Sequence, residues 1–364
     1  KGCMSKNNLL LALALYVVSA VVSFGVMTAL SRSSVATTSD QTAQTDGTDD
    51  EGSQLGTLLQ ISPQEPRNSI CPLNGAKYTA AEQAAWEKRR PLAVMIENTP
   101  DARPQSGMSD ADVVFEAVAE GGVTRFMGLF YCAVQVRDTT LAPIRSARTY
   151  FVDWASGFNL PMYVHVGGAN VPGPTDALGQ ISDYGWNGQN DMNQFSIGYP
   201  TFVRDYNRVP GKEIATEHTM VTTTEKLWAV ATKREWTNMS PDRKVGRSTV
   251  PGSDWKAGYK GWSFTDSETP GSGSVSTISY DFFGGYDPYD VQWTYDKASN
   301  SFLRAHGGEK HTDLNDDSQV VAKNVIVLFT TEKGPINEKM HMLYTTTGTG
   351  KALVFKDGAA IEAN

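Results

Sequence analysis

Cysteine is scarce in this chain: 3 of 364 residues are Cys, and no two have the CxxC spacing. This scarcity excludes a disulfide scaffold, a zinc ribbon and a thioredoxin-like motif. Cys71 and Cys132 lie in the body of the chain, whereas Cys3 precedes the first apolar run. In an exported protein Cys71 and Cys132 can form a disulfide; as separate residues they are buried thiols that pack like small hydrophobes. The sequence leaves both alternatives open.

Basic residues are too few for a nucleic-acid scaffold. Lys and Arg total 32 against 40 Asp and Glu, which gives a net charge of -8, and no Lys/Arg run is present. Binding to a phosphate backbone requires a basic face. We therefore expect no nucleic-acid partner.

The common catalytic motifs are also missing. The chain has no GxSxG, no GxGxxG and no HExxH, so it carries no signal for a hydrolase elbow, a dinucleotide site or a zinc protease. The segment HGGEKHTD does contain metal-ligand types at His306, Glu309, His311 and Asp313, but its Gly pair predicts a hairpin turn. We predict no cofactor and no bound metal.

One long apolar run is present, from Leu9 to Leu30, and it contains no charge over 22 residues. As a helix it measures ~33 Å, enough to cross a bilayer. A cleaved signal peptide is the alternative, because residues 29–31 offer a passable small-x-small site, although the run is longer than an ordinary signal core. Two Lys precede the run and one Arg follows it, which places residues 1–8 in the cytoplasm and the body outside.

A polar tether follows the predicted membrane helix. Residues 31–54 hold no aromatic and almost no aliphatic side chain, so they cannot bury enough surface to offset their ordering entropy. We predict a flexible linker over 31–77, with the lipid bilayer as a partner through residues 9–30.

Helix and strand signals intermingle over residues 78–236, which predicts a mixed α/β domain. A capping box opens a helix in TAAEQAAWEKRR, and the apolar run LAVMI predicts a buried strand. DVVFEAVAE and TRFMGLFYCAV predict two strands joined at Gly121 and Gly122, and MYVHV predicts another. SARTYFVDWASGF predicts a helix with Ser146 as a possible N-cap, and a second capped helix is predicted over 222–236.

The rest of the chain favours β structure. Polar Gly/Ser/Pro-rich sequence over 237–274 predicts an interdomain linker. Beyond it, six segments with period-two alternation predict a mostly antiparallel β domain over 275–364, so the whole is an α+β protein. The last segment, KALVFKD, leaves a sheet edge with no evident cover, from which we expect a truncated C-terminal domain.

Several segments resemble the bacterial YerB-like family, which carries a two-part domain of unknown function. They include RPLAVMIEN, ARPQSGMSDADVVFEAVAEGGVTRFMGLF, PIRSARTYFVDWA, YVHVGG, VQWTYDKASNSFLRAHGGEKHTD and GTGKALVFKDG. The resemblance implies an exported lipoprotein with an α+β N-terminal and a β-rich C-terminal domain, and a family length that extends beyond residue 364. The lipid-accepting Cys of such proteins is missing, because no Cys lies between Cys3 and Cys71. We expect a single-pass protein of the bacterial cell membrane whose body is extracytoplasmic.

Charged residues beside Gly-rich turns or a predicted helix start form the first candidate site. Carboxylates beside guanidinium groups can bind an anion and move a proton, whereas an internal Arg–Glu network is the structural alternative. On one strand, Glu116 and Glu120 should face one side, as the acid and base of a glycan hydrolase or transferase would. The site comprises Glu116, Glu120, Arg125, Arg145, Ser146 and Arg148.

His165 at the end of YVHVGG is a further candidate, although a lone His is more often simply hydrogen-bonded. The Gly/Asn/Pro/Asp-rich stretch over 167–200 is long enough to line a site. We predict a tethered module that binds an envelope component: an anionic or carbohydrate polymer, or an envelope protein. The alternatives are an envelope glycan hydrolase or transferase that uses Glu116 or Glu120, and a purely structural assembly partner.

Overall fold

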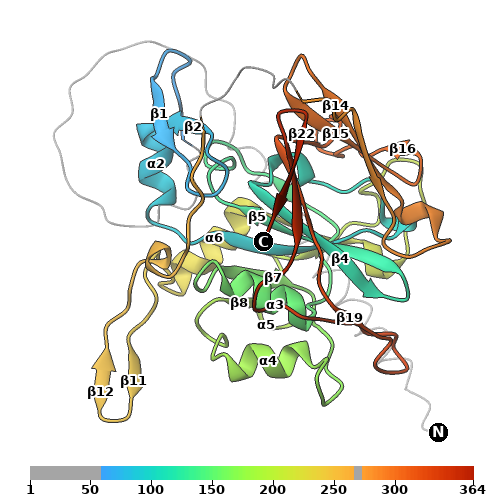
Figure 1. Ribbon diagram of the computed structural model, residues 1–364. Coiled ribbons are helices and arrows are strands. Elements are labelled where there is room, and N and C mark those ends of the chain that lie inside the picture. Colours follow the sequence, from blue (N-terminus) through green and yellow to red (C-terminus); the bar gives the residue numbers. More distant parts are fainter. Residues whose placement is uncertain (1–58, 266–272) are drawn as a thin grey trace, which may run out of the picture. The chain divides into compact units, whose positions relative to one another are not determined.

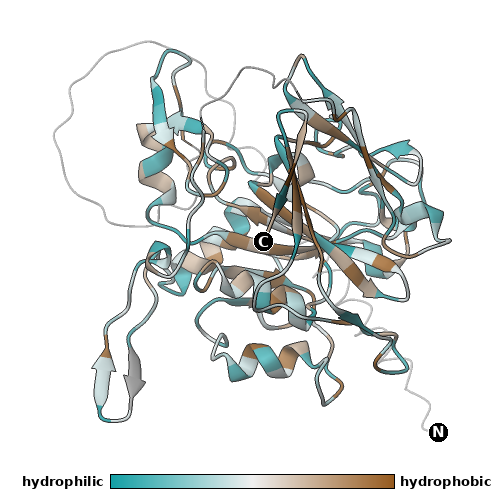
Figure 2. Ribbon diagram, in the orientation of Figure 1, coloured by the Kyte–Doolittle hydropathy of each residue, from teal (hydrophilic) through white to brown (hydrophobic). Residues whose placement is uncertain are grey.

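A five-stranded mixed sheet forms the centre of the computed structural model, which describes residues 59–265 and 273–364 (Figure 1). Its strand order is β4-β5-β3-β7-β8; β4, β5 and β3 are antiparallel, whereas β3, β7 and β8 are parallel. Every residue of β3 is buried, as its unbroken apolar run predicts, and Figure 2 shows the hydrophobic character of the central strands. The strands are β3 (Leu92–Glu97), β4 (Val113–Glu120), β5 (Val123–Phe130), β7 (Met162–His165) and β8 (Asp191–Asn193).

Two hydrophobic clusters cover the two faces of this sheet. On one face, Met95 and Met127 pack with α2 (Ala80–Trp86), α3 (Thr149–Ser156) and α4 (Ala177–Asp183). On the other, Val94 and Phe126 pack with α6 (Thr224–Lys233) and β10 (Met220–Thr223). Strand β10 lies between β6 (Thr140–Leu141) and β9 (Val203–Arg204) in a small antiparallel sheet.

Local signals place most of these elements correctly. The capping box between Thr79 and Glu82 forms at α2, although the helix ends at Trp86, and the β4–β5 hairpin turns at Gly121 and Gly122. These two glycines have φ values of 57° and 85°, which other residues rarely adopt.

Ser146 is not an N-cap, so that prediction is wrong. Helix α3 starts at Thr149 and its cap residue is Arg148, which makes no side-chain cap bond. The physical reason is the parallel bridge between Ala147 and Gly168, which holds the chain extended just before the helix.

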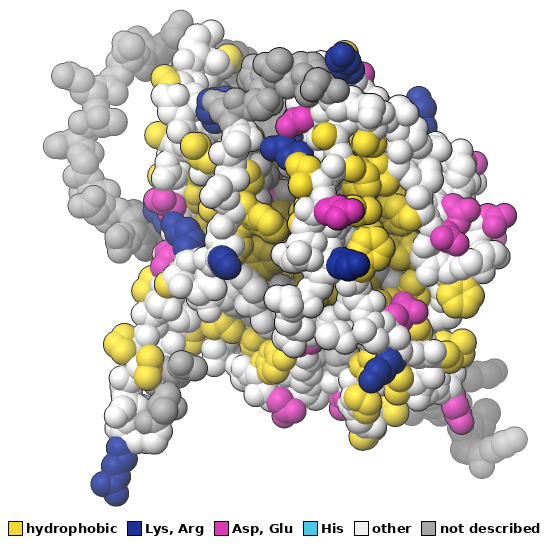
Figure 3. Space-filling view, viewed as in Figure 1, with side chains coloured by type: hydrophobic (Ala, Val, Ile, Leu, Met, Phe, Trp, Pro, Cys, Tyr) yellow, Lys and Arg dark blue, Asp and Glu magenta, His cyan; other side chains and the backbone are white. Residues whose placement is uncertain are grey.

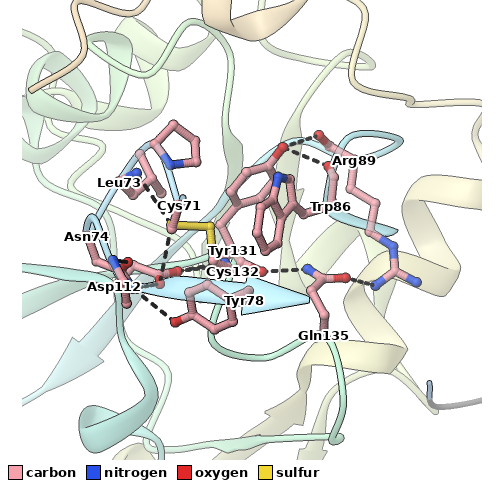
Figure 4. The surroundings of a disulfide bond; sticks show 12 residues. Cys71, Leu73, Asn74, Tyr78, Trp86, Arg89, Asp112, Tyr131, Cys132 and Gln135 are labelled. Carbon is pink, nitrogen blue, oxygen red and sulfur yellow. Dashed lines mark hydrogen bonds between the residues drawn. A yellow bond between two sulfur atoms is a disulfide. The ribbon is translucent and has the colours of Figure 1, made fainter. Parts of the chain in front are cut away.

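The segment before α2 is ordered, although we expected it in the flexible linker. Strand β1 (Arg67–Ile70) pairs with β2 (Lys77–Thr79), and a disulfide joins Cys71 to Cys132 with 6.0 Å between Cα atoms (Figure 4). The pairing that the sequence left open is thus a disulfide, and it fixes β1 and β2 to the end of β5. Beside it, the buried Asp112 carboxylate accepts hydrogen bonds from the backbone N–H groups of residues 131 and 132.

The polar segment after α6 also packs onto the sheet domain. It forms a hairpin of β11 (Arg243–Val245) and β12 (Ser248–Val250). Trp255 is fully buried, and its Nε1 donates a hydrogen bond of 3.2 Å to the Tyr131 hydroxyl. The compact body therefore includes residues that we expected in an interdomain linker.

Residues 273–364 form antiparallel sheets, as the alternation predicts. The first has the order β13-β14-β15-β16, with β17 also paired to β15; the second has the order β18-β21-β22, and β19 pairs with β20. Strand β22 covers the edge of β21, so the expectation of an uncovered edge there is wrong: the short segment AAIEA was not recognised as a strand. The strands are β13 (Thr277–Tyr280), β14 (Val291–Asp296), β15 (Ser301–His306), β16 (Glu309–Lys310), β17 (Val321–Ala322), β18 (Asn324–Leu328), β19 (Glu332–Lys333), β20 (Leu343–Tyr344), β21 (Ala352–Lys356) and β22 (Ala359–Ala363).

The fold is therefore α+β, with a mixed N-terminal part and a β-rich C-terminal part. The predicted membrane helix from Leu9 to Leu30 lies outside the described residues. Within 59–265 and 273–364, every helix is too short or too polar to cross a bilayer. Short single-turn helices complete the body: Pro100–Ala102, Met108–Asp110, Thr216–His218, Trp255–Ala257 and Asp287–Tyr289, together with α5 (Gln194–Ile197).

Candidate functional site

Glu120 lies at the end of β4 and pairs with two arginines. Its carboxylate accepts hydrogen bonds from Arg125 Nη2 at 2.9 Å, and from Arg148 Nε and Nη2 at 3.0 and 2.8 Å. Arg125 Nη1 also donates to the Ser146 carbonyl. Burial acts to raise the pKa of Glu120, but the charges of Arg125 and Arg148 outweigh it and lower the pKa to about 2. One carboxylate is thus shared by two guanidinium groups inside the protein.

Arg145 belongs to a neighbouring pair. Its Nε lies 3.1 Å from Glu97 Oε1, and the other oxygen of Glu97 is 2.8 Å from His218 Nδ1. Burial opposes ionisation of Glu97, but the His218 hydrogen bond and the Arg145 charge prevail and lower its pKa. Arg145 is therefore paired with a buried carboxylate.

Glu116 and Glu120 lie on opposite faces of the sheet, so the expectation that both face one side is wrong. Glu116 pairs across the strands with Phe126, whereas a bulge between Val118 and Glu120 shifts the register and turns Glu120 to the face of Arg125. This geometry separates the two carboxylates that a glycosidase would require on one side.

Glu116 instead links the two parts of the body. Its Oε2 accepts a hydrogen bond of 2.7 Å from Arg304 Nη2 on β15, and its Oε1 accepts one from Thr124. Arg304 Nη1 also donates to Nδ1 of His306 and of His311, whose rings stack with 4.2 Å between centroids.

The metal-ligand types of HGGEKHTD are used in other ways. Both imidazoles accept from Arg304 through Nδ1, and His311 Nε2 donates to Gln105 Oε1 at 3.0 Å. The carboxylate of Asp313 accepts from the backbone N–H groups of Gly107 and Ser109, at 3.0 and 2.8 Å. These side chains join the two parts of the body.

His165 is fully buried at the end of β7, and both of its ring nitrogens have oxygen partners. Nδ1 lies 2.7 Å from the Gly167 carbonyl oxygen, and Nε2 lies 2.7 Å from Asp191 Oδ1. The Asp191 side chain is 13% exposed, so the pair reaches the surface through this carboxylate. Of the predicted site residues, His165 is the one that contacts the loop over 167–200, through Gly167 and Asp191.

The loop over 167–200 is held by hydrogen bonds within itself. It contains α4, β8 and α5, and Asn193 Oδ1 accepts hydrogen bonds from Gly167 N and Phe195 N at 3.1 and 3.2 Å. The Phe195 ring lies 3.0 Å from the position of a Cβ on Gly167, whose φ of 56° already favours glycine. The two ends of the loop are thereby held together beside His165.

An open depression of about 450 Å³ lies where this loop meets the residues that follow α6. Arg234 stacks over the Trp236 ring at 4.8 Å from its centroid, and Trp236 Nε1 donates to the Gly188 carbonyl at 3.1 Å. We call this depression, lined by Asn187, Gly188, Asp191, Ser196, Arg234 and Trp236, the loop depression.

Sequence reasoning found the loop but missed most of the residues in the depression. Glycine and asparagine enrichment marks the loop between residues 185 and 193. Arg234 and Trp236 follow α6, and Trp236 is 48 residues from Gly188, so no local pattern predicts that the two fold together.

The fold defines a class: a two-part α+β protein whose N-terminal mixed sheet is joined by buried charges to C-terminal antiparallel sheets. The chain belongs to the family described as protein of unknown function DUF3048, whose N-terminal domain matches residues 78–237 and whose C-terminal domain matches residues 280–364. It is 28% identical over 304 residues to the putative lipoprotein YerB of Bacillus subtilis (strain 168), covering 83% of this chain and 79% of that protein. The crystal structure of YerB is similar, with a TM-score of 0.60 and 25% identity over 81% of this chain and 86% of that one.

Proposed function

We propose that this chain is a membrane-tethered, extracytoplasmic protein that binds a carbohydrate polymer of the cell envelope through the loop over 167–200. Three observations support the location. The run from Leu9 to Leu30 is long enough for an anchor, the body contains a disulfide, which persists in oxidising compartments, and its Bacillus relative is named a putative lipoprotein.

Exposed aromatic side chains on the loop carry the proposal for binding. Phe195 is 75% and Tyr199 is 84% exposed. Large aromatic side chains in water are costly unless a partner covers them, and their flat faces suit the apolar C–H faces of sugar rings. Phe195 directly precedes Ser196, which lines the loop depression, and the amide, carboxylate and hydroxyl groups of that depression can bond sugar hydroxyls.

Charge favours a carbohydrate of low charge density over a highly charged polyanion. The net charge of -8 opposes binding to a highly charged polymer. On the face shown in Figure 3, Lys and Arg side chains are scattered among acidic and polar ones and form no continuous basic patch.

Co-sedimentation of the purified full chain with insoluble cell-wall glycan tests the proposal. We expect saturable binding, weakened about tenfold (~1.4 kcal/mol) when Phe195 and Tyr199 are both replaced by Ala. Phe283→Ala is the matched control, because that ring is 53% exposed but lies outside the loop. Equal binding by the double variant and the control, or no binding by the wild type, contradicts the proposal.

A further inference from the structure

The loop depression contains one charge that the protein does not balance. The Arg234 guanidinium lies over the Trp236 ring, with Cζ 4.8 Å from the ring centroid, and among residues 59–265 and 273–364 no carboxylate lies within ion-pair distance of it. The ring covers one side of the guanidinium and leaves its N–H groups available. A guanidinium can bind a carboxylate through two parallel hydrogen bonds.

The other ionisable group of the depression, Asp191, is bonded from behind. Its Oδ1 lies 2.7 Å from His165 Nε2, and His165 Nδ1 lies 2.7 Å from the Gly167 carbonyl oxygen. One carboxylate oxygen of Asp191 is therefore engaged by the buried imidazole, and the other can accept a hydrogen bond from a hydroxyl or amide group.

The remaining lining groups are neutral and polar. Asn187 offers an amide and Ser196 a hydroxyl, and both are exposed. Gly188, with a φ of 76°, presents its backbone at the wall, and its carbonyl fixes the Trp236 ring. A cation beside an aromatic edge, an amide and a hydroxyl is complementary to a sugar that carries both a carboxylate and an N-acetyl group.

We propose that the loop depression is a subsite for an acidic N-acetylated sugar, whose carboxylate binds Arg234 and whose hydroxyl and amide groups bond Asn187, Asp191 and Ser196. This inference rests on the proposed function and specifies which unit of the glycan is recognised. Phe195 and Tyr199 then contact neighbouring units of the polymer, whereas Arg234 selects the acidic one.

Two soluble sugars test the inference by isothermal titration calorimetry with the purified full chain in detergent. N-acetylmuramic acid carries a carboxylate, and N-acetylglucosamine has the same ring without it. We expect the acidic sugar to bind at least tenfold more tightly, and Arg234→Gln to abolish this preference because it removes the charge. Lys233→Gln is the matched control, since Lys233 is an exposed neighbour outside the depression.

Several outcomes overturn the inference. The inference is wrong if the wild type binds the two sugars with equal affinity. It is also wrong if Lys233→Gln loses the preference as fully as Arg234→Gln, because that result indicates a general charge effect. If neither sugar binds while wall glycan still co-sediments with the chain, the subsite is wrong and the proposed function stands. If the glycan also fails to co-sediment, the proposed function fails as well.

Discussion

Among the described residues, Glu120 is the one carboxylate within ion-pair distance of both Arg125 and Arg148. The Arg125 side chain is 2% exposed and that of Arg148 is 8% exposed, so water cannot replace the carboxylate if it is lost. Arg125 Nε already lacks a hydrogen-bond partner. The stability of this corner of the sheet therefore depends on one residue.

Glu120→Gln should lower the free energy of unfolding by about 3 kcal/mol, because two buried guanidinium groups lose the carboxylate that they share. Urea unfolding of the purified chain measures the change. Glu213→Gln is the control, because Glu213 is exposed and should change stability by less than about 0.5 kcal/mol. Similar unfolding midpoints for the two variants would show that Glu120 does not stabilise the pair.

Single residues also show where sequence reasoning reached its limit. It grouped Glu120, Arg125 and Arg148 with Glu116, Arg145 and Ser146 in one candidate site, and it retained an internal Arg–Glu network as an alternative. It could not foresee that a bulge in β4 separates Glu116 from Glu120, because a bulge is set by pairing with β5 and not by the alternation of the strand itself.

At the scale of the element, β15 carries Arg304 and His306, and a second imidazole partner of that arginine, His311, directly follows β16. Burial and the Arg304 charge lower the pKa of His306 to about 2, and they also lower that of His311. In the unfolded chain each imidazole regains a pKa near 6.5. Below that pH the unfolded state binds protons that the folded state does not, so these groups reduce stability as the pH falls.

Replacing His306 with Asn should remove one of the two imidazoles that bind a proton in the unfolded chain but not in the folded one. Between pH 6 and pH 5, the stability of the variant relative to the wild type should improve by about 1.2 kcal/mol, whatever their difference at neutral pH. Burial raises the pKa of Asp112 to about 7, which has the opposite effect, but this contribution is the same in both proteins and cancels. Thermal unfolding at each pH measures the difference. Glu309→Gln on the exposed strand β16 is the control, and a parallel pH dependence of wild type and His306→Asn contradicts the assignment.

Elements that depend on signals within their own sequence were predicted well. Those that depend on contacts with residues distant in the sequence were not. The capping box of α2, the Gly-Gly hairpin and the buried run of β3 each have a local signal. By contrast, β1 is held by a disulfide across 61 residues, and Trp255 is buried against Tyr131. These contacts give polar stretches a fixed place that composition alone does not reveal.

At the scale of the whole molecule, buried polar groups hold the two parts of the body together. Arg304 on β15 reaches Glu116 on β4, and His311 reaches Gln105. The Asp313 carboxylate bonds the backbone of the turn at 107–109. Such groups are costly to bury unless every partner is present, so the two parts should be stable only in one mutual arrangement.

Arg304→Met should therefore destabilise the contact between the two parts of the body as well as strand β15. It leaves the Glu116 carboxylate without its counter-charge and two imidazoles without their donor, at a cost of about 3 kcal/mol. We expect hydrogen exchange, followed by mass spectrometry, to accelerate in β14, β15 and the 105–110 turn, while α6 on the N-terminal sheet remains protected. Lys310→Met, at an exposed position on β16, should leave exchange in all of these segments unchanged. If Arg304→Met changes exchange in β15 alone, the arginine stabilises its own strand and the contacts of Asp313 hold the two parts together without it.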